Sequence, residues 1–88
     1  MENKIILGSL ALDLKRAAIG FHRGSYAMAE KFLSEAIKRK NEYKKDNIKP
    51  YLLRLLEKIE NLKTQSKDEL AENALMYSTL IQNYVLHI

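Results

Sequence analysis

The chain has 88 residues, of which 30% are charged, with a formal net charge of +4 and no cysteine. This length allows one domain with a single core and leaves no room for a separate catalytic module. The lack of cysteine excludes a disulfide framework, thiolate metal ligands and cysteine nucleophiles, and it suits a reducing, cytoplasmic compartment. With one proline and three glycines, the chain lacks the turn residues that an all-β domain requires, so we expect an all-α fold.

Apolar residues recur every three or four positions in four segments, which is the spacing of an amphipathic helix. We therefore predict helices over residues 4–22, 25–45, 48–63 and 67–86. Short connections between them favour an up-down-up-down four-helix bundle that forms one domain over residues 1–88, with the first and fourth helices side by side. The predicted inward residues are Leu7, Leu10, Leu14, Ala17 and Phe21 in the first helix, Tyr26, Ala29, Phe32, Leu33, Ala36, Ile37 and Tyr43 in the second, Ile48, Leu52, Leu55, Ile59 and Leu62 in the third, and Leu70, Ala74, Tyr77, Ile81 and Tyr84 in the fourth.

The segment from Ile5 to Leu14 is apolar, but Asp13 interrupts it and no small-residue cleavage site follows. We interpret it as part of the first helix rather than as a signal peptide. The longest uncharged stretch, Asn73–Ile88, contains polar side chains and is shorter than the roughly 20 apolar residues that cross a bilayer. We therefore expect a soluble protein without a membrane span.

Two connections carry recognisable turn and capping residues. Gly24 can adopt positive φ at the end of the first helix, and Ser25 can cap the second helix through its side chain. Before the third helix, Asp46 or Asn47 can act as the cap, and Pro50 is tolerated in a first helical turn.

The start of the fourth helix has the most specific local signal. Ser66 is followed three residues later by Glu69, which is the spacing of a capping box, and acidic residues in a first turn suit the helix dipole.

The segment Gly24-Ser25-Tyr26-Ala27-Met28-Ala29, followed by Leu33 and Ala36, resembles the second half of a tetratricopeptide (TPR) repeat. The resemblance covers residues 14–38 and implies a TPR-like helical hairpin at the start of the fold. It places these residues on the large, small and aromatic positions of the family's first helix: Leu14, Ala17, Ala18 and Phe21.

A lone hairpin of this kind also resembles the microtubule-interacting and trafficking (MIT) domain, a compact helical relative of the repeat. The segment Glu57–Lys63 is similar to the end of the third helix of that domain. The resemblance implies that the protein binds a short amphipathic helix of a partner in a groove between its own helices. The fourth helix departs from the pattern of that family.

Motifs for common chemistries are missing from the sequence. The segment Gly20–Ser25 lacks the lysine and glycine spacing of a phosphate-binding loop. Neither His22 nor His87 follows a glutamate at the spacing that a di-iron bundle requires. Two carboxylate pairs, Glu57 with Glu60 and Glu69 with Glu72, lie off the apolar stripes and are interpreted as solvated. We expect no catalytic, cofactor-binding or metal site.

Arg16 and His22 form the one catalytic alternative. An arginine and a histidine at this spacing resemble the nuclease signature of HEPN domains, small helical bundles that cleave RNA as dimers. The resemblance implies that His22 acts as acid or base and that Arg16 holds a phosphate. The other interpretation is a solvent-facing arginine and a helix-terminal histidine.

A basic segment lies between residues 38 and 49. Its net charge of +4 equals that of the whole chain, so it could follow a nucleic-acid backbone, with Tyr43 available for stacking. A lysine-rich helix end that complements the helix dipole is the favoured interpretation. The candidate nucleic-acid contacts are Lys38, Arg39, Lys40, Lys44, Lys45 and Lys49.

The last turns of the fourth helix, Leu75–Ile88, have apolar residues on more than one face and no charged residue. A helix buried on one side should carry a charged outer stripe, so we expect a second molecule to cover this one. A homodimer about a two-fold axis is the first hypothesis, and the helix of another protein is the second. The predicted interface residues are Ile6, Met76, Leu80, Asn83 and Leu86.

The sequence therefore predicts a non-enzymatic helical interaction module or assembly subunit, dimeric through its fourth helix. Two alternatives stay open: a nucleic-acid-associated protein that uses residues 38–49, and a HEPN-like ribonuclease.

Overall fold

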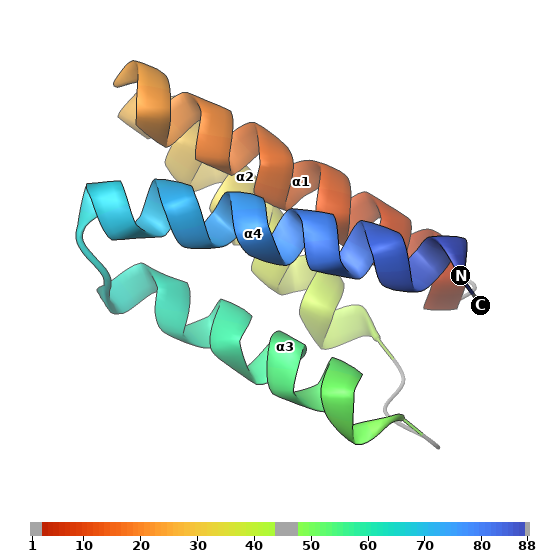
Figure 1. Cartoon of the computed structure of the whole chain (residues 1–88). Coiled ribbons are helices and arrows are strands. Elements are labelled where there is room, and N and C mark those ends of the chain that lie inside the picture. The colour runs from red at the N-terminus through yellow and green to blue at the C-terminus, as the bar shows by residue number, and fades with distance from the viewer. Residues whose placement is uncertain (1–2, 44–47, 88) are drawn as a thin grey trace.

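The computed structural model describes residues 3–43 and 48–87. They form an all-α bundle in which consecutive helices run in alternating directions (Figure 1). The elements are α1 (Asn3–Arg23), α2 (Tyr26–Glu42), α3 (Pro50–Glu60), the short 3₁₀ helix η1 (Asn61–Thr64) and α4 (Lys67–Leu86). The predicted all-α bundle is confirmed.

Helix α1 lies at the corner of the bundle between α2 and α4, and it packs closely against both. The start of α1 and the end of α4 lie at the same end of the molecule (Figure 1), as expected for antiparallel neighbours. Helix α3 completes the bundle opposite α1, and it packs against α2 and α4 at fewer points. The apolar side of α1 contributes three fully buried residues to the core, Leu7, Leu10 and Leu14.

Most of the predicted inward residues are buried. There are five exceptions: Tyr26 is exposed, and Phe32, Tyr43, Ile48 and Tyr84 are partly buried against the core. The stripe of α3 is wider than predicted, because Leu56 is also fully buried. The core therefore follows the helical period of the sequence closely.

The connections differ in how their caps are made. Ser66 caps α4 as predicted: its Oγ accepts a hydrogen bond from the backbone N–H of Glu69 at 3.3 Å. The side chain of Ser25 makes no capping hydrogen bond, so that prediction is wrong. At Ser25 the backbone carbonyl accepts from Ala29 N–H at 2.9 Å instead. Pro50 lies in the first turn of α3, after Lys49 as the cap.

Asp46 and Asn47, the predicted caps of α3, lie outside the described residues. So do Lys44 and Lys45, where the second helix was expected to end; the described part of α2 ends at Glu42.

Two of the three glycines are required by the fold. Gly24 has a φ of +80° and makes the turn between α1 and α2. A Cβ at Gly20 would lie 2.8 Å from the Cβ of Ala29, so this glycine lets α1 and α2 approach closely. Gly8 is different, because a Cβ there would meet nothing within 4 Å. Glycine inside a helix costs about 1 kcal/mol relative to alanine, and no contact of the described chain accounts for that cost.

The two serines at helix starts form a matched pair of test sites. We expect Ser66→Ala to lower the free energy of unfolding by about 1 kcal/mol, because it removes a side-chain cap. Ser25→Ala should change it by no more than about 0.5 kcal/mol, because its side chain makes no such bond. Urea denaturation followed by circular dichroism measures both values. Equal losses for the two variants would contradict this assignment of the caps.

Candidate functional site

The structure separates the five predicted interface residues. Ile6 is buried, with 2% of its surface exposed, so its placement on an exposed patch is wrong. It lies on the core side of α1, together with Leu7 and Leu10. Leu80 is partly buried against the core, whereas Asn83 and Met76 are exposed. Leu86 is 71% exposed and is the most exposed large apolar residue of the described chain.

The solvent-facing side of α4 is uncharged over its last three turns. Ser78 does not belong to it: this residue is buried, and its Oγ donates a hydrogen bond to the carbonyl oxygen of Ala11 on α1 at 2.7 Å. Thr79 bonds the carbonyl oxygen of Leu75 within its own helix. We call the exposed residues of this region the outer face of α4; they are Leu75, Met76, Thr79, Gln82, Asn83 and Leu86.

The outer face of α4 continues onto the neighbouring helix α1. Ile5 and Leu12 are each about half exposed there, and Gly8 lies between them. A groove of about 350 Å³ runs between the two helices, and we call it the α1–α4 groove. It is lined by Gly8, Ala11, Leu12, Lys15, Gln82, Val85 and Leu86. One charged side chain, that of Lys15, borders it, so the combined surface is apolar and amide-rich.

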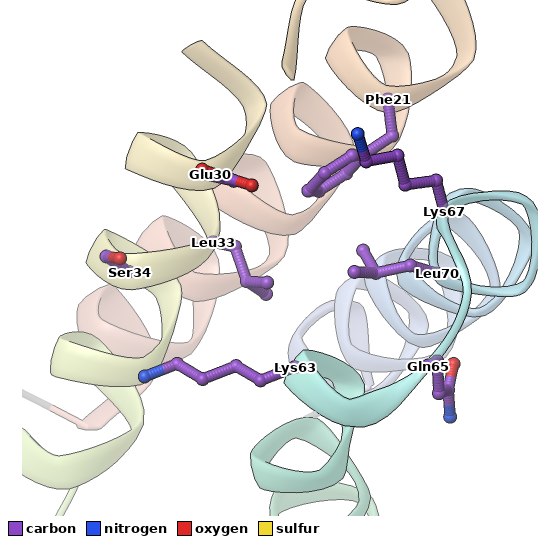
Figure 2. A pocket seen from close by; sticks show the side chains of 8 residues that line it. All are labelled: Phe21, Glu30, Leu33, Ser34, Lys63, Gln65, Lys67 and Leu70. Atoms are coloured by element: carbon purple, nitrogen blue, oxygen red, sulfur yellow. The ribbon is translucent and has the colours of Figure 1, made fainter. Parts of the chain in front are cut away.

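A second hollow, of about 370 Å³, lies at the opposite end of the bundle between α2 and the start of α4 (Figure 2). Its floor consists of Phe21, Leu33 and Leu70, which are already buried in the core. On its rim, Lys63 reaches toward α2 (Figure 2), and the ammonium of Lys67 lies 3.6 Å from the centre of the Tyr26 ring. The hollow offers little exposed apolar surface, so it is the weaker candidate.

Two of the four described basic residues of segment 38–49, Arg39 and Lys40, form ion pairs within the chain. Lys40 is buried, and its Nζ lies 2.7 Å from Oε1 of Glu60 on α3. The guanidinium of Arg39 pairs with Glu42 at 3.3 Å. Of the candidate nucleic-acid contacts, only Lys38 and Lys49 are described as exposed. The expectation that Lys40 is available to a phosphate is therefore wrong, because its long apolar stem is buried between helices.

The polar contact between α1 and α2 is centred on Asp13. Burial raises the pKa of this carboxyl above 3.8, and repulsion from Glu35 adds to the rise, while the positive charges of Arg39 and Arg16 lower it. The effect of burial on the pKa of Asp13 is larger than the opposite effect of the two arginines.

Tyr43, the aromatic side chain of the basic segment, is partly buried against the core. Burial, and the nearby phenol of Tyr84, raise its pKa above 10.0. Its ring is thus used for packing, which leaves less of it for stacking on a base.

Arg16 and His22 do not converge. At about 100° per residue, six positions place them about 120° apart around α1. The guanidinium of Arg16 lies over the ring of Phe32 on α2, with its Cζ 5.5 Å from the ring centre. A shared phosphate site between the two side chains is not formed within one chain.

Comparison of the chain with protein-family models, curated proteins and solved structures finds no match. Within residues 3–43 and 48–87, no helix is long and apolar enough to span a membrane. The same part of the chain has no group of three or more histidine, aspartate or glutamate side chains that could hold a metal ion.

The ion pair of Lys40 has a testable energetic signature. Glu60→Gln leaves the buried ammonium with a weaker partner, and because the Glu60 side chain is 43% exposed we expect a loss of about 1 to 2 kcal/mol in unfolding free energy. Lys40→Met removes the buried charge and keeps the apolar stem, so its loss should be smaller. Chemical denaturation compares the two, and a larger loss for Lys40→Met would contradict the assignment.

Proposed function

We propose that the protein is a non-enzymatic helical interaction module that self-associates through the outer face of α4 and the adjoining edge of α1. The observation that carries the proposal is the absence of charge on the exposed outer face of α4. The chain has 15 basic and 11 acidic residues, yet the described outer face of α4 has none. Leu75, Met76 and Leu86 are exposed there, and Leu86 lines the α1–α4 groove together with Leu12 of α1.

Energetic considerations support a covered surface. A bundle of this size buries only about 60 to 65% of the surface of its unfolded chain, so its stability margin is small. The described chain exposes 5609 Å², and a typical stable interface removes about 800 Å² from each partner. Burial of about one seventh of this surface would therefore suffice for a stable dimer. Each Å² of apolar area in it contributes about 25 cal/mol to the free energy of association, before the entropic costs of binding.

The chemistry of the surface favours a second copy as the partner. A net charge of +4 makes two copies repel each other, and an interface centred on the uncharged outer face of α4 keeps this repulsion weak. The amides of Gln82 and Asn83 each donate and accept hydrogen bonds, so the surface can pair with itself about a two-fold axis. Apolar side chains beside amides are therefore self-complementary.

The resemblance of residues 14–38 to a TPR-like hairpin, as in MIT domains, supports the same class of function, since MIT domains bind short amphipathic helices of partner proteins. Nucleic-acid binding by residues 38–49 has less support, because Lys40 is paired with Glu60. Hydrolysis of RNA has less support as well, because Arg16 and His22 face different sides of α1.

Two residues with the same exposure on different faces provide the test. Leu75 on α4 is 48% exposed and Met28 on α2 is 51% exposed. We expect the wild type to be dimeric at tens of micromolar and Leu75→Glu to raise the dissociation constant by about a hundredfold, because it places a carboxylate in an apolar interface. Met28→Glu should leave the constant unchanged. Sedimentation equilibrium measures all three proteins.

Leu80→Glu is a less specific variant, because Leu80 also packs against the core and its loss would affect folding. A wild type that stays monomeric across this concentration range, or equal effects of Leu75→Glu and Met28→Glu, would contradict self-association through this surface.

A further inference from the structure

Gly8 is the glycine that the fold of a single chain does not explain. It lies well inside α1, it is exposed, and a Cβ at this position would meet open space. The other two glycines have reasons within the chain: the contact with Ala29 at Gly20, and the positive φ at Gly24. A helical position that disfavours glycine and has room for a side chain points to a contact made from outside the chain.

The surroundings of Gly8 have the outline of a packing hole. Gly8, Ala11, Leu12 and Lys15 line the α1–α4 groove from one side. Their spacing of three, four and seven residues is that of the four residues that surround a side chain inserted from a facing helix. Because Gly8 has no side chain, the floor of the groove is open at that position, and Leu12 stands half exposed one turn further along the helix.

We infer that α1 of a second copy packs antiparallel across this groove, with Leu12 of each copy inserted over Gly8 of the other. A two-fold axis that passes α1 midway between residues 8 and 12 produces both contacts at once. The same register places Ile5 opposite Lys15 of the second copy. The aliphatic stem of that lysine can cover Ile5 while its ammonium stays in solvent.

This inference rests on the proposed self-association and adds its register. Two features of this surface favour a second copy as the occupant. The hole and the side chain that fits it lie on the same helix, four residues apart, so one surface supplies both halves of the contact. The outer face of α4 beside it carries no charged residue, so no like charges face each other across that part of the contact.

The test exchanges the hole and the inserted side chain. Gly8→Leu fills the groove, and we expect it to raise the dimer dissociation constant by about tenfold or more, because overpacking separates the helices. Leu12→Gly should weaken the dimer by a similar factor. The double variant Gly8→Leu/Leu12→Gly restores a leucine opposite a glycine in the same register, so it should recover most of the wild-type affinity, as measured by sedimentation equilibrium.

We expect Gly8→Leu to fold, because its side chain meets open space in the monomer and leucine favours the helix. A loss of dimer in this variant can therefore be separated from a loss of folding. Circular dichroism should show unchanged or higher thermal stability for this variant under dilute, monomeric conditions. If the wild type and Gly8→Leu dimerise equally well while Leu75→Glu does not dimerise, the inference is wrong and the proposed function stands. A double variant as weak as the single ones overturns the register, and a monomeric wild type overturns both proposals.

Discussion

The fold depends on the burial of α1 against two neighbours at once. Leu7, Leu10 and Leu14 are fully buried along this helix, and α2 and α4 are the two helices that approach it closely. A different contact holds each neighbour close to α1. The missing side chain of Gly20 lets Ala29 of α2 approach, and the hydroxyl of Ser78 on α4 donates a hydrogen bond to the carbonyl oxygen of Ala11. Helix α3 then covers the remaining side of α2 and α4, opposite α1.

Buried polar groups set the relative positions of the helices more specifically than the apolar stripes do. The Ser78 hydroxyl would be left without its partner if the carbonyl of Ala11 moved out of reach, and an unsatisfied buried hydroxyl costs about 1 to 3 kcal/mol. The pair of Lys40 and Glu60 has the same role between α2 and α3, where few close backbone contacts are made. Polar contacts thus add to the register that the packing of the apolar core sets.

The elements could be predicted from the sequence because their signals are local. The helical period places the core residues on one side of each helix, and Ser66 with Glu69 marks the start of α4. The errors concern residues whose environment depends on which helices meet. Ile6 lies beside the stripe that the periodicity defines, yet it is buried. In the sequence nothing distinguishes Lys40 from the neighbouring solvated lysines, because its partner Glu60 is 20 positions away.

The candidate surface follows from the same arrangement. Because α1 packs on two sides only, its third side faces solvent, and Ile5, Leu12 and Ile19 recur there every seven residues. A seven-residue apolar repeat is the pattern with which one helix packs along another. The fold of one chain supplies no helix for this side, since α3 lies opposite. The surface of α1 and the uncharged side of α4 therefore form one contiguous region that a second antiparallel pair of helices would cover in a single packing layer, and the bundle would then bury α1 on all sides.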